Sequence, residues 1–161
     1  NPYFDTCNNI SSLYVAKDYI SNAIIIDGDQ IVTDSTIFSP EFENSGYNCV
    51  WQENESKEWM LTLDDRYKVL SCSSTGGNHA WQLYGISRWT KEDGIKLKEL
   101  LELEFKKKKN TQIYWDDIAM FEHFDEFNLQ GYPMHAGGVK EIDSLDELIG
   151  EDSSYRCYKG E

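Results

Sequence analysis

Two short acidic clusters are the residues of this chain whose type and position could do chemistry. Asp27 and Asp29 follow the apolar run at residues 23–26, and Asp116 and Asp117 follow an aromatic pair. Mg²⁺ takes hard oxygen ligands, commonly one or two carboxylates together with substrate phosphates and water. Two converging aspartates would therefore suffice for a metal site. The alternative is that these residues only cap turns and helix ends, a common role of short Asp pairs.

Aromatic residues near these clusters indicate a second kind of chemistry. A quaternary ammonium group cannot donate a hydrogen bond, so it is best recognised by the faces of Trp or Tyr, each worth about 0.5–2 kcal/mol. The candidates are Trp59, which follows the charged stretch 53–58, Tyr114, which lies two residues before Asp116, and Trp89. Plain core packing is the alternative for all three, and Trp89 has the weakest case for a ligand role.

The elements that must position these residues are those of an α/β protein. The spacing of Leu13, Ala16 and Ile20 predicts a helix over residues 12–20. The run at 23–26 predicts a strand that is covered on both faces in a largely parallel sheet. Asp27 and Asp29 would then follow the carboxyl end of a buried strand, where α/β sheets bind ligands.

The rest of the chain alternates strand and helix signals. Residues 47–51, 59–63 and 67–70 predict a β-meander, and residues 81–89 predict a strand that returns to the main sheet. Further patterns predict a helix after Thr90, an extended segment at 112–117 that feeds another helix, a short strand at 142–143 and a last helix capped by Ser144. We expect one domain over residues 1–161.

Composition excludes several classes of function. The net charge of −14 argues against non-specific nucleic-acid binding, which requires clusters of Lys and Arg. No apolar run is long enough to span a bilayer, so membrane insertion is not expected. The four cysteines show no C-x-x-C spacing, which indicates free thiols and a cytoplasmic protein.

Six sequence pieces, in order and at consistent spacing, resemble the bacterial CTP:phosphocholine cytidylyltransferases, nucleotidyltransferases with a GT-A-like, Rossmann-related mixed sheet. The pieces are Asn8-Asn9-x-x-Ser12-Leu13-Tyr14, Ile26-Asp27-Gly28-Asp29, Glu58-Trp59, Gly85-Ile86-Ser87-x-Trp89, Tyr114-Trp115-Asp116 and Glu141-Ile142-Asp143. The resemblance implies that Asp29 and Asp116 are the catalytic Mg²⁺ ligands, with Asp27 in support. It also places Asn8 and Asn9 against the nucleotide, and Trp59, Trp89 and Tyr114 around choline.

The implied substrates are CTP and phosphocholine, and the implied products are CDP-choline and pyrophosphate. Relatives begin with a strand and a glycine-rich loop carrying Arg and Lys, and nothing of that kind occurs in these 161 residues. We therefore expect this chain alone to have little or no activity. An open sheet edge left by the missing strands would favour a homodimer or pairing with a partner.

Three alternatives stay open at this point. A sugar-1-phosphate nucleotidyltransferase uses a similar sheet and metal site, but it surrounds its acceptor with polar groups. A phosphoethanolamine enzyme is a closer competitor, because its ammonium can donate hydrogen bonds. The third alternative is a non-catalytic remnant that binds choline without turnover.

Overall fold

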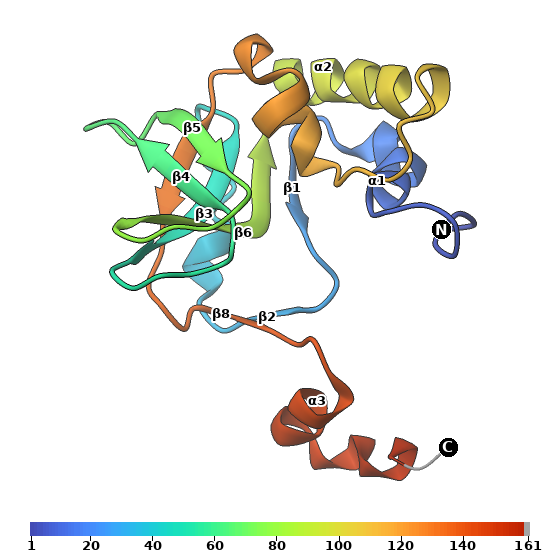
Figure 1. Cartoon of the computed structure of the whole chain (residues 1–161), viewed down its shortest axis with the longest axis vertical. Helices are drawn as coiled ribbons and strands as arrows, with labels where there is room; N and C mark the ends of the chain where they lie inside the picture. The colour runs from blue at the N-terminus through green and yellow to red at the C-terminus, as the bar shows by residue number, and fades with distance from the viewer. Residues whose placement is uncertain (160–161) are drawn as a thin grey trace.

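The computed structural model describes residues 1–159, in which a mixed sheet is covered by helices and followed by a separate C-terminal arm (Figure 1). The main sheet has six strands, and two further strands form a separate antiparallel ribbon. The strands are β1 (Ala23–Ile26), β2 (Gln30–Val32), β3 (Gly46–Gln52), β4 (Met60–Leu63), β5 (Val69–Ser73), β6 (Ala80–Trp89), β7 (Gln130–Pro133) and β8 (Val139–Glu141). A mixed α/β fold was predicted and is confirmed.

Strand β6 is the centre of the main sheet, and two different strands, β4 and β1, share one of its edges. The other edge pairs with β3 over most of its length. On the forked edge, β6 pairs with β4 at Trp81 and Gln82 and with β1 from Ile86 to Trp89. The strands β4 and β1 therefore separate from β6 around residues 83–85, which leaves a gap in the sheet that we call the fork.

Two predictions about the sheet were wrong. The expected β-meander is limited to the β4–β5 hairpin, because β6 lies between β3 and β4 in the strand order β5-β4-β6-β3-β7. The strand at 23–26 forms as β1, but it pairs antiparallel with β6, and its side chains are half-buried or exposed. The parallel pair in the sheet is β3 with β7. Within residues 1–159, β1 has no second strand partner, so pairing at its outer edge stays a prediction.

Two helices begin at the caps that the sequence predicted, whereas α1 begins at Ile10, two residues before the expected start. Thr90 caps the helix that follows it through Asp93 N, and Ser144 caps the last helix through Glu147 N. The segment at 112–117 contains no strand, and the strand expected at 142–143 ends instead at Glu141. The helices and helical turns are α1 (Ile10–Ala16), η1 (Lys17–Tyr19), η2 (Ser35–Phe38), α2 (Lys91–Leu101), η3 (Glu102–Lys107), η4 (Ile118–Glu122), η5 (Phe124–Glu126), α3 (Leu145–Glu151) and η6 (Ser153–Tyr158).

Trp89 is part of the main core, which corrects its expected role in a ligand pocket. Its side chain is fully buried, and its ring centroid lies 6.1 Å from that of Tyr47 and 5.6 Å from that of Phe127. The indole N–H donates to Ser87 Oγ at 2.9 Å. Trp89 therefore has no surface left for a ligand. A smaller second core cluster joins Ile37, Ile86 and Val139.

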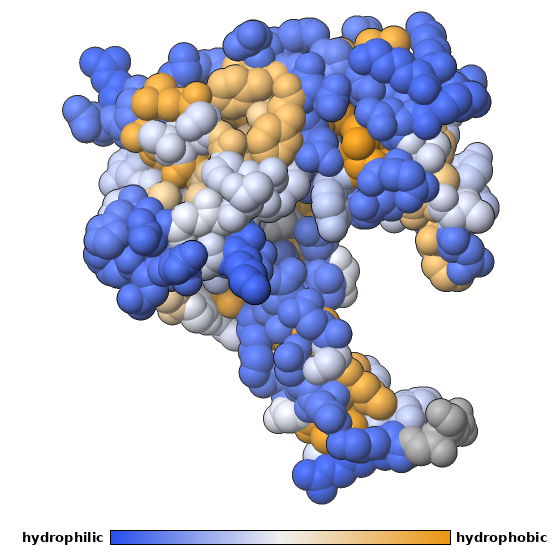
Figure 2. Space-filling view, in the orientation of Figure 1, coloured by the Kyte–Doolittle hydropathy of each residue, from blue (hydrophilic) through white to orange (hydrophobic). Residues whose placement is uncertain are grey.

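The arm, formed by α3 and η6, projects away from the sheet, and its two helical pieces pack on each other (Figure 1). Figure 2 shows a mostly hydrophilic surface, with apolar residues gathered on the arm and over part of the sheet. The four cysteines all lie within the described residues and are free thiols. None of the helices in residues 1–159 is long and apolar enough to cross a membrane.

Candidate active site

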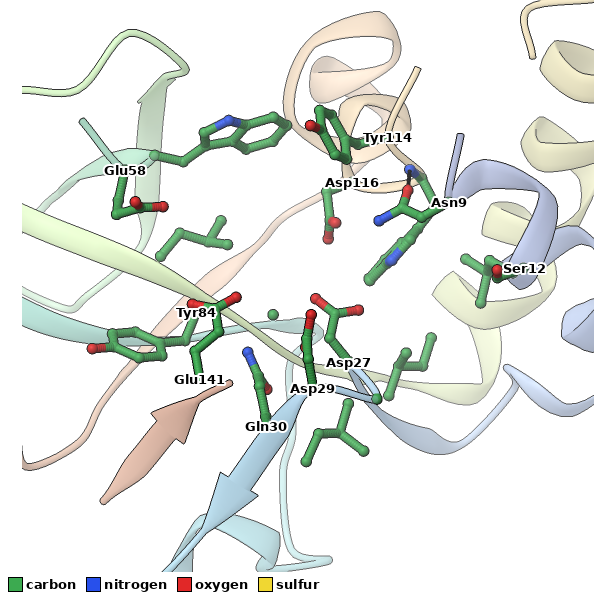
Figure 3. A pocket seen from close by; sticks show the side chains of 18 of the residues that line it. Asn9, Ser12, Asp27, Asp29, Gln30, Glu58, Tyr84, Tyr114, Asp116 and Glu141 are labelled. Atoms are coloured by element: carbon green, nitrogen blue, oxygen red, sulfur yellow. Dashed lines mark hydrogen bonds between the residues drawn. The ribbon is translucent and has the colours of Figure 1, made fainter. Parts of the chain in front are cut away.

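A cavity of about 660 Å³ lies at the fork of the sheet and brings together most of the residues selected from the sequence. Asp27 and Asp29 enter it from the end of β1, and Asp116 enters from the loop before η4 (Figure 3). The side chain of Trp59 comes from just before β4, on the other arm of the fork. The gap between β1 and β4 is therefore what makes room for a ligand. We call this cavity the fork pocket.

Gly85 on β6 provides the space for the Asp27 carboxylate. The Asp27 N–H donates to the Gly85 carbonyl at 3.1 Å, which continues the β1–β6 pairing by one residue. A Cβ at position 85 would lie 1.9 Å from Asp27 Oδ2, far inside van der Waals contact. Burial, together with the charge of Asp29, raises the pKa of Asp27 to about 6. Gly85 had no role in the sequence-based prediction.

Asp116 is a buried carboxylate with an unused oxygen. Only 7% of the residue is exposed, and burial together with the charge of Asp27 raises the pKa of Asp116 well above its ordinary value. Neither its Oδ1 nor the hydroxyl of Tyr47 makes a well-formed hydrogen bond, although the two groups lie close enough together to shift each other's pKa. A cation in the pocket would give this oxygen a stronger partner.

A second acidic group adjoins the first through the β2–β8 ribbon. Gln30 pairs with Glu141 across the ribbon, and Ile142 N–H donates to the Asp29 carbonyl at 2.8 Å. This arrangement brings carboxylate oxygens of Asp29, Glu141 and Asp143 within 4.8 Å of one another. Glu141 and Asp143 belong to one of the quoted motifs, which was the available signal, but no role was predicted for them.

Asn9 and Asn8 have different positions. Asn9 lines the fork pocket, and its Oδ1 accepts a hydrogen bond from Trp115 N at 2.9 Å, which ties α1 to the segment that carries Asp116. Asn8 lies outside the pocket lining, where its Nδ2 donates to the Gln112 carbonyl at 3.1 Å. Asn8 therefore supports the same segment from outside the pocket lining, and its contact with a nucleotide stays a prediction.

An aromatic wall stands on the side of the pocket opposite the β2–β8 ribbon. The rings of Trp59 and Tyr114 meet edge to face with centroids 5.9 Å apart, and Tyr114 is 50% exposed. Phe121 packs behind Trp59 at 5.2 Å. Glu58 also lines the pocket, and its charge contributes to raising the pKa of Glu141 after burial and nearer carboxylates. The pocket thus combines aromatic faces with several carboxylates, a chemistry suited to a cation.

Comparisons with known proteins agree with this geometry. No protein-family profile matches the chain. It is 29% identical over 150 residues to 2-aminoethylphosphonate cytidylyltransferase of Lancefieldella rimae, which covers 92% of the chain and 60% of the relative. It is 26% identical over 149 residues to choline-phosphate cytidylyltransferase of Streptococcus pneumoniae, which covers 91% of the chain and 63% of the relative. The chain is thus similar to two cytidylyltransferases over about nine tenths of its own length.

A solved structure shares the fold of this chain. The solved CTP:phosphocholine cytidylyltransferase of Streptococcus pneumoniae superposes with a TM-score of 0.83 at 23% identity, over 96% of this chain and 66% of that structure. The chain spans about three fifths of the length of the curated relatives it matches.

The residues of the fork pocket fit a divalent cation. Asp29, Asp116 and Glu141 line this pocket with hard oxygen ligands, and Asp143 adds a carboxylate beside Asp29 and Glu141 from outside the lining. Mg²⁺ is bound by such oxygens together with substrate phosphates. A cation would also offset the burial and the repulsion between carboxylates that raise the pKa of Asp27 and Asp116.

Proposed function

We propose that this chain carries the metal-binding and acceptor-binding part of a cytidylyltransferase that transfers CMP from CTP to phosphocholine. The observation that carries the proposal is the fork pocket, where carboxylates for a metal stand opposite an aromatic wall. Sugar phosphates have no positive charge, so a sugar-1-phosphate acceptor would make no cation–π contact with Trp59 or Tyr114 and no ion pair with Glu58.

The reaction requires little covalent chemistry from the protein. An oxygen of the acceptor phosphate attacks the α-phosphorus of CTP, a new P–O bond forms, and the bond to pyrophosphate breaks. A phosphomonoester is largely dianionic near neutral pH, so no general base has to remove a proton. Alignment and charge neutralisation then supply the catalysis.

The side chains of the fork pocket divide these tasks. Mg²⁺, when bound, would neutralise charge on the reacting phosphates. Asp29 and Asp116 would hold it, with Asp27 between them. Trp59 and Tyr114 would receive the ammonium headgroup, and Asn9 would hold the loop of Asp116 in place through Trp115 N.

The grouping of Asp29 with Glu141 and Asp143 favours a second assignment of the metal ligands. In this assignment Asp29 is shared, and Asp143 replaces Asp116 as the opposite ligand. Mn²⁺ binding, measured by water-proton relaxation, separates the two assignments without any turnover. Asp29→Asn should abolish binding in both, whereas Asp116→Asn and Asp143→Asn should differ by at least tenfold in affinity. Unchanged binding in Asp29→Asn would refute both.

The relative from Lancefieldella rimae makes 2-aminoethylphosphonate the second candidate acceptor. Both acceptors carry a cationic nitrogen two carbons from the phosphorus-bearing group, but only the primary ammonium donates hydrogen bonds. Calorimetry with Mg²⁺ and a CTP analogue should compare phosphocholine, phosphoethanolamine, 2-aminoethylphosphonate and glucose 1-phosphate. Tighter binding of phosphocholine supports the proposal, and tighter binding of 2-aminoethylphosphonate supports the second candidate.

Trp59→Ala tests the aromatic wall directly. Loss of one cation–π contact should weaken phosphocholine binding about fivefold to thirtyfold. Trp51→Ala is the matched control, because Trp51 is 43% exposed on β3 and lies outside the pocket lining. Equal effects of the two substitutions would contradict the role of the wall. Binding of phosphocholine without release of pyrophosphate in the protein that contains this chain would indicate the non-catalytic remnant.

A further inference from the structure

Arg88 is a buried cation on the face of β6 opposite Asp27. Side chains alternate along a strand, so Gly85 and Trp89 face the main core and the Asp27 carboxylate, whereas Ile86 and Arg88 face the second core cluster. Only 4% of Arg88 is exposed. The guanidinium therefore lies on the far side of the sheet from the face that carries the Asp27 carboxylate.

No carboxylate pairs with Arg88 among residues 1–159. Its Nη1 donates to Asn48 Oδ1 at 2.5 Å, its Nη2 donates to the Ile37 carbonyl, and its Cζ lies 4.5 Å from the centre of the Tyr132 ring. These partners are neutral, and a guanidinium has further N–H donors to offer. Buried charges are normally paired, so this one lacks its counter-charge in a chain with 29 acidic residues.

A cavity of about 320 Å³ opens onto Arg88, and we call it the Arg88 cavity. Ser39, Asn48 and His135 add polar groups to its lining. Asp34 and Glu41 also border it, but the Asp34 carboxylate is already engaged by Thr36 N at 3.0 Å and Thr36 Oγ1 at 2.6 Å. Glu41 is exposed and makes no ion pair within the described residues.

We propose that the Arg88 cavity binds a small oxyanion, a carboxylate or a phosphate group, through the guanidinium of Arg88. The planar fork of Arg matches two oxygens of either group, and the pairing would supply the missing counter-charge in a setting of low solvent exposure. The volume lies at the small end of the range for ligand pockets, which suits a small oxyanion.

The walls of the cavity connect this site to the acidic ribbon. The turn η2, which contributes Ile37, follows β2, and Met134 and His135 precede β8. The strands β2 and β8 form the ribbon that places Asp29 beside Glu141. An anion held between these two walls would brace the ribbon, so binding should raise the melting temperature of the protein.

The test is a titration of isotope-labelled, metal-free protein followed by amide chemical shifts, with inorganic phosphate and acetate in separate arms at constant ionic strength. Saturable shifts are expected at Ile37, Met134 and His135 and not at Asp27 or Asp29. Omitting metal keeps this result independent of the proposed transferase activity. Binding in one arm only identifies the preferred oxyanion.

Two substitutions assign the effect to Arg88. Arg88→Lys keeps the charge and removes the planar fork, so it should weaken binding about tenfold. Glu41→Gln, at an exposed position that cannot disturb the core, should strengthen binding about threefold at low ionic strength, because it removes a repelling charge. The proposal is overturned if neither arm gives saturable shifts at the cavity, or if Glu41→Gln and Arg88→Lys both bind as the unsubstituted protein does.

Discussion

The Asp27 carboxylate lies where a side chain on Gly85 would be: a Cβ on residue 85 would lie 1.9 Å from the Asp27 carboxylate oxygen Oδ2 and 2.8 Å from its Cγ. The strand that forms the floor of the fork pocket thus lacks a side chain where an acidic group lies against it. This relationship makes the position of Asp27 depend on a residue that carries no chemistry of its own.

Gly85→Ala should displace the Asp27 carboxylate and weaken metal binding about tenfold. Substitution of a residue that orients metal ligands typically lowers metal affinity by about this factor. Mn²⁺ titration measures the effect. Gly28→Ala is the matched control in the same acidic cluster, because an added Cβ there meets nothing within 4 Å. A loss of affinity in Gly28→Ala as large as in Gly85→Ala would contradict the steric explanation.

Asp116→Asn should stabilise the metal-free protein by about 1–2 kcal/mol, because a neutral amide avoids the cost of burying an ionisable carboxyl group beside Asp27, the cost that raises the pKa of Asp116. Chemical denaturation without metal measures this change. Added Mg²⁺ should raise the melting temperature of the unsubstituted protein more than that of the variant. The carboxylate would thus lower the stability of the protein without metal and raise it with metal, as expected of a residue kept for binding a ligand.

Asp117→Asn is the neighbouring control for that experiment. Asp117 Oδ2 accepts a hydrogen bond from Tyr114 N at 2.7 Å, and an amide oxygen can replace it in this role. Its free energy of unfolding should therefore change by less than about 0.5 kcal/mol. A destabilised Asp116→Asn variant beside a neutral Asp117→Asn variant would show that the Asp116 carboxylate is structural.

Trp89→Ala should destabilise the protein by about 3–5 kcal/mol, the usual cost of removing a buried large aromatic side chain. The reason is its full burial among Tyr47, Trp115 and Phe127 and its hydrogen bond to Ser87. Trp51→Ala, at a 43% exposed position, should cost much less. Denaturant unfolding of both variants checks this. A ligand-binding defect in Trp89→Ala without loss of stability would restore its predicted role in the pocket.

Glu104 should make stability depend on pH in the acid range. Its burial opposes ionisation, but hydrogen bonds from Lys108, His123 and Asn110 outweigh burial and hold the pKa of Glu104 below its ordinary value of 4.5. A lowered pKa in the folded state means that the stabilisation is fully present above 4.5 and is lost as the pH falls through the folded value.

Glu104→Gln should therefore lower the free energy of unfolding by about 2 kcal/mol at pH 7 and by less at pH 3. Urea unfolding at several pH values measures the difference between the two proteins. Glu99→Gln, an exposed position on α2, the helix that precedes η3, is the control and should change little at either pH. A difference for Glu104→Gln that is constant with pH would exclude the proposed ionisation effect.

Local signals in the sequence predicted local structure well. The apolar run at 23–26 forms β1, and Thr90 and Ser144 cap the helices that follow them, because these patterns depend on neighbouring residues only. The placement of β6 between β3 and β4 was missed, because strand order depends on contacts between distant segments. The resemblance to known enzymes selected the acidic and aromatic residues that line the pocket.

The remaining parts of the site depend on distances that no local pattern encodes. Glu141 and Asp143 reach Asp29 only because β2 and β8 pair across more than a hundred residues of chain. Gly85 matters only because Asp27 lies against it. Trp89 shares its residue type with Trp59, and burial alone separates a core tryptophan from one that lines a pocket.

The fork has a consequence for how the chain tolerates insertions. β6 has ten residues, whereas β1 and β4 have four each and reach it from opposite ends of one edge. Trp59 and Asp27 already bond to Leu83 and Gly85 on β6, so only Tyr84 separates the two arms along this edge. An insertion that extended either short strand past Tyr84 would make the sheet edge continuous and would close the opening of the fork pocket.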